Sequence, residues 1–267
     1  EAGVRLRALT AEEEARVAVG SAQSSSPIEP FASYTVGRAR REFANQSALG
    51  VMMTATNRNV GDERSPMRLL SNSAYAGGVD WDVRLASKRY ALAGYLAATR
   101  VNGTEAAIAR LQENNVHSFQ RPDATHVEFD PTRTTLSGQA GSLAFRKISG
   151  ARVRFESNVS FKTPGFDSND LGFIRRGDQI TQSNWLQWRH DQPGKFIRSF
   201  RFNINQWGGH NFDGDRLYFG GNVNAHWTFK NNWRTGFGIN RERDSFDDRA
   251  TRDEPGANYE GNCNFWN

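Results

Sequence analysis

The chain has 267 residues and a formal net charge of +5, because 34 lysines and arginines outnumber 29 aspartates and glutamates. The basic residues are scattered among acidic ones rather than gathered in a block with interleaved aromatics, so the charge does not predict a nucleic-acid partner. The single cysteine, Cys263, excludes an internal disulfide and a zinc site built from cysteines, and no run of about 18 apolar residues predicts a transmembrane helix.

The start of the chain predicts a short helix and a linker. Thr10 can cap a helix that has Glu13 at its third helical position, and a serine run with two prolines follows. We therefore expect an N-terminal segment and linker over residues 1–30 and a β domain over residues 31–267.

Beyond residue 30 the dominant pattern is alternation of apolar and polar residues, which is typical of strands with one wet face. The stretch LYFGGNVNAHWTFK (217–230) shows it, with Val223 on one side and Asn222 and Asn224 on the other. We predict ten strands, at about 34–43, 48–56, 76–86, 89–101, 134–147, 150–161, 180–191, 195–208, 217–229 and 233–243.

The lengths and connections of these strands favour one architecture. Most strands have 9 to 14 residues, whereas strands of soluble sheets have about 5 to 6 and tilted membrane-spanning strands about 9 to 11. Short turns alternate with long connections at 57–75, 102–133, 162–179 and 209–216. An up-and-down outer-membrane barrel has short turns at one rim and long loops at the other. We expect an all-β, antiparallel up-and-down outer-membrane β-barrel, incomplete at about ten strands.

In such a barrel the two faces of each strand have different surroundings. Leu217, Phe219, Val223 and Phe229 would face the acyl chains of outer-membrane lipid. The opposite faces would line the lumen, and they carry Asp80, Asp82, Arg84, Arg152, Arg154, Glu156, Arg201, Asn203, Asn222, Asn224 and His226. We favour a network in which these polar residues pair with one another over an open channel. A soluble sheet with one wet face alternates in the same way, so a β-sandwich stays open as the alternative.

The stretch TPGFDSNDLGFIRRGD (163–178) is the strongest candidate for ligand or loop contacts. Pro164 and Gly165 bend the chain, and both signs of charge then come together in Asp167, Asn169, Asp170, Arg175, Arg176 and Asp178. These residues could form an inward-folded plug or a clamp in which arginine binds a carboxylate. We favour structural pairing over ligand contact.

Two further groups of polar residues resemble cation sites only faintly. His126, Glu128 and Asp130 lie close together in one long loop, and HNFDGD (210–215) places Asn211, Asp213 and Asp215 at alternating positions. The second group lacks the downstream glutamate of a calcium loop, so a turn built by Asp-Gly is favoured. We therefore predict no metal site, no cofactor and no catalytic residue.

Several stretches of the sequence resemble an uncharacterised bacterial family. They are LTAEEEARV (9–17), IEPFASYTVGRARREF (28–43), GVMMTATNR (50–58), AYAGGVDWDVRL (74–85), FQRPDATHVEFD (119–130), TPGFDSNDLGFIRRGD (163–178) and DDRATRDEP (247–255). Members of that family join an N-terminal carbohydrate-binding family 9-like module to a C-terminal outer-membrane β-barrel domain of unknown function. The chain departs from the family where TRDEP (251–255) replaces a Gly-rich TRGGP-like stretch.

The resemblance covers nearly the whole chain and implies an outer-membrane location with a link to glycan handling. It supplies no catalytic residues. The carbohydrate-binding module is absent here, and the chain opens at Glu1 without a signal peptide, which was either removed or belongs to a longer protein. We therefore expect an internal fragment or a truncated copy of the family's protein, with the carbohydrate-binding module in the parent.

The leading hypothesis is an outer-membrane module that anchors its parent protein or passes glycan-related ligands, with lipid and glycan as partners. A soluble or surface-exposed carbohydrate-binding β-sandwich is one alternative. A glycan hydrolase is the other, with Asp167, Asp170 and Asp178 as the residues to test.

Overall fold

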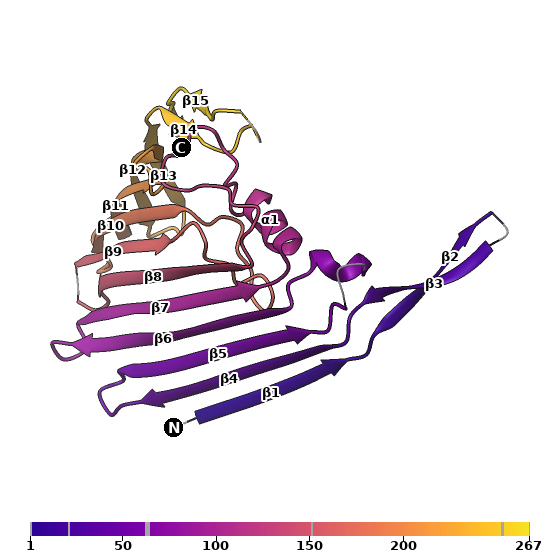
Figure 1. Ribbon diagram of the computed structural model, residues 1–267. Helices are drawn as coiled ribbons and strands as arrows, with labels where there is room; N and C mark the ends of the chain where they lie inside the picture. Colours follow the sequence, from indigo (N-terminus) through magenta and orange to yellow (C-terminus); the bar gives the residue numbers. More distant parts are fainter. Residues whose placement is uncertain (1, 21, 62–64, 151, 252–253, 267) are drawn as a thin grey trace.

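The computed structural model describes residues 2–20, 22–61, 65–150, 152–251 and 254–266. The regular secondary structure of the described chain is almost entirely β, and its main element is a 12-stranded sheet in the order β1-β4-β5-β6-β7-β8-β9-β10-β11-β12-β13-β16 (Figure 1). Its strands are β1 (Ala2–Thr10), β4 (Ala32–Glu42), β5 (Ala48–Arg58), β6 (Ser73–Leu85), β7 (Tyr90–Asn102), β8 (Thr135–Lys147), β9 (Val153–Lys162), β10 (Gln179–His190), β11 (Ile197–His210), β12 (Arg216–Phe229), β13 (Arg234–Glu242) and β16 (Cys263–Trp266).

Two small hairpins and two short helices complete the fold. The smaller sheets pair β2 (Glu13–Val19) with β3 (Ala22–Glu29), and β14 (Ser245–Asp247) with β15 (Ala257–Tyr259). The β2–β3 hairpin projects away from the main sheet (Figure 1). The helices are the 3₁₀-helix η1 (Pro66–Leu69) and the α-helix α1 (Glu105–Glu113).

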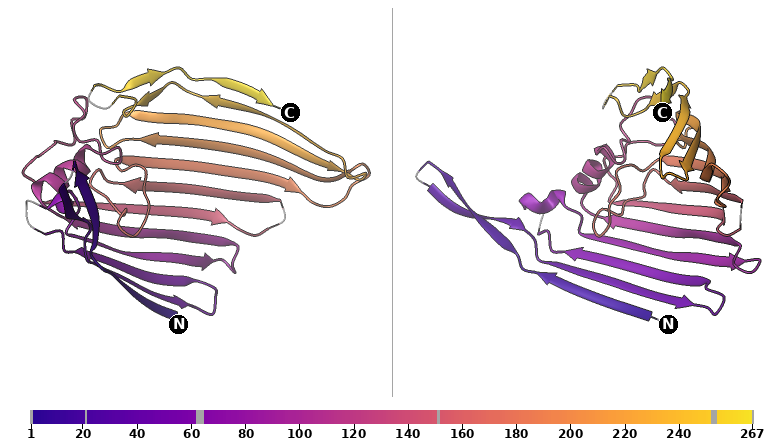
Figure 2. Two further views of the ribbon diagram at one scale, coloured as in Figure 1. Left: turned by 90° about the vertical axis from the view of Figure 1, so that its right-hand side faces the viewer. Right: turned by 180° about the vertical axis from the view of Figure 1, so that it is seen from behind.

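The prediction of strands beyond residue 30 is confirmed, because β4 to β13 correspond one to one with the ten predicted strands. Every pairing along the main sheet is antiparallel. The chain crosses back and forth between neighbours, so short turns gather at one end of the sheet and long connections with α1 at the other (Figure 2).

The helix predicted at the start of the chain is wrong. Thr10 ends β1 and Glu13 opens β2, so neither residue is part of a helix. β1 pairs with β4 along its whole length, from Ala2 opposite Arg40 to Thr10 opposite Ala32. A ladder with a distant strand outweighs a local capping pattern, whose contribution is about 1 kcal/mol. The predicted linker is likewise wrong, because most of it is β3.

The sheet is open rather than closed on itself. β1 and β16 lie at its two edges, and the pairings among the described strands do not join them. The expected closure into a barrel is therefore not a feature of this structure.

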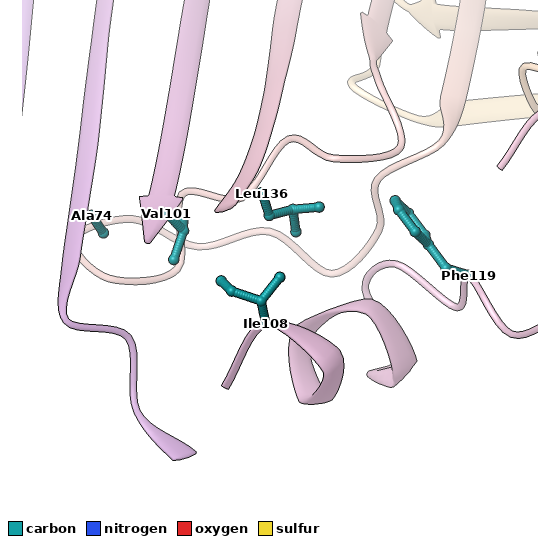
Figure 3. Packing of buried hydrophobic residues seen from close by; sticks show 5 residues of the cluster. All are labelled: Ala74, Val101, Ile108, Phe119 and Leu136. Atoms are coloured by element: carbon teal, nitrogen blue, oxygen red, sulfur yellow. The ribbon is translucent and has the colours of Figure 1, made fainter. Parts of the chain in front are cut away.

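The hydrophobic core lies between α1 and one face of the sheet, which we call the inner face; the opposite face is the outer face. Ile108 of α1 is fully buried and packs against Val101 of β7 and Leu136 of β8 (Figure 3). Ala74 and Phe119 complete the buried cluster. The helix is positioned by its N-cap, where the backbone N–H of Ala107 donates to the Thr104 hydroxyl over 3.1 Å.

The outer face carries a continuous apolar band, because residues of like character lie in register on neighbouring strands. Along one row across five strands lie Phe155, Leu186, Ile204, Val223 and Ile239. The next row holds Val153, Trp188, Phe202, Ala225 and Phe237. Val223, Ile204, Leu186 and Ile239 are 39–43% exposed although large and apolar. We call these two rows the outer apolar band.

Leu217 does not belong to this exposed surface, although the alternation predicts it. Its exposed fraction is 8%, and it lies at the start of β12, a strand that β14 also contacts. The expectation that Leu217 faces acyl chains is therefore wrong.

None of the helices among the described residues is long and apolar enough to cross a membrane.

Candidate functional site

The candidate site is the packed group of long loops at one end of the inner face, which we call the loop plug. Its central segment, 163–178, lies directly on β8, and glycine makes this approach possible. A Cβ added to Gly138 of β8 would overlap the backbone nitrogen of Phe166, and one added to Gly165 would overlap the carbonyl oxygen of Ser137. The two backbones therefore approach more closely than any other residue pair would allow.

A buried histidine fixes this segment to the loop that follows α1. The side chain of His117 is completely buried; its Nδ1 lies 2.7 Å from the carbonyl oxygen of Pro164 and its Nε2 lies 3.0 Å from Asp167 Oδ2. The backbone N–H of Asp167 donates to the hydroxyl of Thr99 on β7 over 3.0 Å. Asp167 therefore connects the segment to two partners: its side chain contacts His117 of the loop after α1, and its backbone is bonded to Thr99 of the sheet.

Charged side chains from distant segments meet at the centre of the plug. Arg121 donates to Asp248 over 2.7 Å and to Asp178 over 3.3 Å, and Arg176 donates to Asp248 over 2.6 Å. The side chains of Arg121, Asp178 and Asp248 are at most 3% exposed. Arg249 donates to the carbonyl oxygens of Asn115 and Val116, over 2.5 and 2.9 Å. We call Arg121, Arg176, Asp178, Asp248 and Arg249 the loop charge cluster.

His126 extends this cluster to the connection between β11 and β12. Its Nε2 lies 2.8 Å from Asp178 Oδ1, and its Nδ1 lies 3.4 Å from Asp213 Oδ2. Asp213 also accepts hydrogen bonds from the backbone and hydroxyl of Thr125. The 211–215 turn is built by Asn211, whose Oδ1 accepts the backbone N–H groups of Asp213 and Asp215. The residues of HNFDGD therefore form a turn locked to the plug.

The cluster changes the ionisation of its members. Burial opposes ionisation of Asp248, but the positive charges of Arg176, Arg121 and Arg249 hold the pKa of Asp248 below its ordinary value. Burial and the neighbouring Arg176 lower the pKa of Arg249 to about 10. Hydrogen bonds from Thr125 lower the pKa of Asp213. Asp248 and Asp213 are therefore ionised in the folded protein at neutral pH.

The residues predicted in 163–178 do not form one site. Asp167 pairs with His117, and Asn169 accepts the backbone N–H of Ile174. Asp170 pairs with Arg58 of β5, and Arg175 lies 5.7 Å from the ring centroid of Phe173. Only Arg176 and Asp178 of the six lie in the loop charge cluster. Each carboxylate of the segment has its own basic partner within the chain.

Most of the predicted lumen-facing residues also find partners on the inner face. Asp80 pairs with Arg38 over 2.5 Å, Asp82 with Arg84 over 3.1 Å, and Glu156 with Arg146 over 3.9 Å. In the later strands amides replace charges: Asn203 donates to Asn224, and Asn205 donates to Asn222. His226 lies 3.1 Å from Asn224. Arg152 lies just before β9, in a bend rather than in a strand, and Nε of Arg154 is buried without a partner among the described atoms.

Pattern analysis missed the residues that complete the plug: His117, Arg121, Asp248, Arg249 and the distant Arg58. Arg121 and Asp248 are separated by 127 positions in the chain. Their identities as charged residues were visible in RPDA and DDRA, but no periodicity links two loops so far apart. The signal that could have found them is the chemical balance between stretches, since a basic residue in one complements an acidic residue in another.

Three stretches that carry the family resemblance therefore converge in space. Residues 119–130, 163–178 and 247–255 each contribute to the loop charge cluster. Residues 3–266 match the family described as Domain of unknown function (DUF5916). The chain belongs to this family. A search of curated proteins found no match, and a search of solved structures found none either.

In this family member the charged side chains at the centre of the loop plug are paired with one another. Asp167, Asp178 and Asp248 of the loop plug face histidine or arginine. Among the described residues no group of three or more His, Cys, Asp or Glu is arranged to hold a metal ion. A buried cluster of paired charges fixes the positions of the loops that carry them. Replacing only the acidic or only the basic member of a pair should destabilise the fold, because the remaining charge would stay buried without its counterpart.

Proposed function

We propose that this DUF5916 chain is an outer-membrane β-barrel module whose outer apolar band contacts lipid and whose loop plug closes one end of the interior. The observation that carries the proposal is the band itself. Large apolar residues lie in register across β9 to β13, and among the described residues no second layer of the chain covers them. Exposed apolar surface of this extent marks contact with a partner or a membrane.

Strand length supports lipid as that partner. β6, β7 and β8 have 13 residues each. A strand of this length tilted by about 45° spans about 30 Å, which is the thickness of the hydrocarbon core. The alternation of short turns and long loops supports the same topology.

The two alternatives have less support. A carbohydrate-binding β-sandwich needs a second sheet packed against the first, whereas the other described sheets are two-stranded hairpins. A glycan hydrolase needs free carboxylates on either side of a bond, whereas Asp167, Asp170 and Asp178 are paired with His117, Arg58 and Arg121.

Within the proposed function, an anchoring role is favoured over passage of a glycan-related ligand. The loop charge cluster is buried and internally paired, so opening a path through it would expose several charges and break their pairs. The link to glycans rests on the resemblance alone, through the carbohydrate-binding module expected in the parent protein.

Accessibility of neighbouring positions tests the membrane proposal. The chain is expressed with an export signal in a Gram-negative bacterium, with Cys263 replaced by serine, and spin labels are attached to Val223→Cys or Asn222→Cys. These residues are adjacent on β12 and face opposite sides of the sheet. We expect the label at 223 in outer-membrane fractions to be relaxed by apolar oxygen and the label at 222 by a water-soluble nickel chelate. A monomer soluble without detergent, with both labels relaxed equally by the chelate, would contradict the proposal.

A further inference from the structure

The inner face carries a basic cavity at the end of the sheet opposite the loop plug. The cavity has a volume of about 720 Å³ and lies at the start of β11, the end of β12 and the start of β13. Charged and hydroxyl side chains line it, among them Ser199, Arg201, His226, Thr228 and Arg234. We call it the basic basin.

The strand register explains why these residues converge. Arg201 of β11 lies opposite His226 of β12, which lies opposite Gly236 of β13. One step nearer the turns, Ser199 lies opposite Thr228, which lies opposite Arg234. All belong to the inner face, because alternate residues of β12 from Asn222 to Thr228 point to the same side. Gly236 leaves room beside His226, since a Cβ there would lie 2.5 Å from Nδ1 of the imidazole.

The basin has positive charge without a matching carboxylate. Several arginines elsewhere on the inner face pair with acids, as Arg38 does with Asp80 and Arg146 with Glu156. The lining of the basin includes neither aspartate nor glutamate. Arg201 and Arg234 are exposed, and within the described part of the chain their side chains have no hydrogen-bonding or ion-pair partner. Arg198 at the rim donates to Asn232, which is neutral.

The groups that face Arg201 from its neighbours do not supply the missing charge. The residue opposite it on β10 is Arg189, whose own partner is Asp191, and the residue opposite it on β12 is His226. Cations directly opposite one another on neighbouring strands destabilise a sheet. An oxyanion bound to Arg201 would offset part of this repulsion, because it would supply the negative charge that the neighbouring strands lack.

We propose that the basic basin is a binding site for a soluble ligand with two or more neighbouring oxyanion groups, of the diphosphate class. Two guanidinium groups provide planar pairs of donors that match phosphate oxygens, and the Ser199 and Thr228 hydroxyls add neutral donors. A soluble ligand is favoured over a lipid headgroup because the basin lies on the inner face, opposite the outer apolar band. The preference for a soluble ligand rests on the membrane proposal, whereas binding of an oxyanion by the two arginines does not, so the titration below tests the site separately.

Titration calorimetry with inorganic pyrophosphate tests the site. The full chain is titrated in a neutral detergent at low ionic strength, alongside the variants Arg201→Gln and Arg234→Gln. Each substitution removes a charged fork, so we expect each to weaken binding on the order of tenfold or more. The matched control is Arg241→Gln, because Arg241 lies on the same strand as Arg234 but on the outer face. Its affinity should equal that of the unmodified chain.

Two outcomes would overturn the proposal. One is no binding of pyrophosphate to the unmodified chain; the other is equal affinity in the glutamine variants and the control. Arg201→Lys keeps the positive charge but lacks the planar guanidinium group. We expect its affinity for pyrophosphate to lie between those of the unmodified chain and Arg201→Gln, a graded result that a folding defect would not produce. Circular dichroism verifies the β content of every variant. If the chain proves soluble without detergent, the same titration is made in buffer.

Discussion

Asp248 shows how a single residue holds distant loops together. It is completely buried and accepts hydrogen bonds from Arg121 and Arg176, which come from two different loops. The contribution of Asp248 to stability includes its effect on these partners, because its loss would leave both arginines without the anion that they share.

Replacing Asp248 by asparagine should therefore be strongly destabilising. Removing one member of a buried ion pair typically costs about 3–5 kcal/mol. The expected result is a loss of that order in the free energy of unfolding, measured by urea or guanidinium titration in detergent. Glu128→Gln provides the control, because Glu128 is exposed in the loop that carries His126; its effect should stay within about 0.5 kcal/mol. Similar effects of the two substitutions would show that the cluster does not hold the plug.

The same residue predicts the response to acid. The pKa of Asp248 in the folded protein lies below its value in the unfolded chain. Its stabilising contribution is therefore fully present above about pH 4, the ordinary value for aspartate, and is lost as the pH falls through the lower folded value. We expect the stability difference between the unmodified chain and Asp248→Asn to be constant from pH 7 to 5 and to shrink towards pH 3. A difference that grows on acidification would contradict this sign.

At the scale of single residues, the sequence pattern identified two members of the loop charge cluster but not their partners. Arg176 and Asp178 lie in a stretch where mixed charge predicts pairing, and the structure shows both of them paired. Their partners Arg121 and Asp248 lie far away in the chain, and the fold alone decides which loops meet.

At the scale of elements, alternation predicts the strands well because period two extends over whole strands and is reinforced by long ladders. The prediction fails at the start of the chain, where β1 has exposed residues throughout and depends on its ladder with β4 rather than on an apolar face. A capping pattern reports only local preference, so Thr10 and Glu13 misled there. The position of α1 on the inner face was equally invisible, because it depends on Ile108 filling a space formed by β7 and β8.

Contact between elements leads to a prediction for Gly138. A Cβ at this position would overlap the Phe166 backbone, which cannot swing away as a side-chain tip can. We expect Gly138→Ala to destabilise the protein by about 1–3 kcal/mol and to increase hydrogen exchange in 163–178.

Gly37→Ala is the matched control for that substitution. Gly37 also lies within a strand of the main sheet, and an added Cβ there would have no heavy atom within 4 Å. The stability of this variant should be unchanged or slightly higher, because alanine reduces the freedom of the unfolded chain. Equal destabilisation by both substitutions would attribute the loss to strand glycines in general rather than to the plug.

At the scale of the whole molecule, the sequence predicts that the sheet has an apolar and a polar face. It does not predict the three-dimensional shape of the sheet. Alternation predicts that Val223 and Asn222 lie on opposite sides, and the register confirms it. Curvature, closure and the placement of loops over one face depend on contacts between segments. This is why Leu217 continues the apolar pattern of its strand and yet lies buried.

The open edges of the sheet have a consequence for how it can be completed. Direction reverses at every step from β1 to β16 in the 12-stranded order, so the two outermost strands run opposite ways. Their unsatisfied N–H and C=O groups can therefore join directly in an antiparallel ladder, and inserting any even number of further strands keeps that match. An odd number would force one parallel seam. Parity thus limits which additional segments, from this polypeptide or another, can complete the ring.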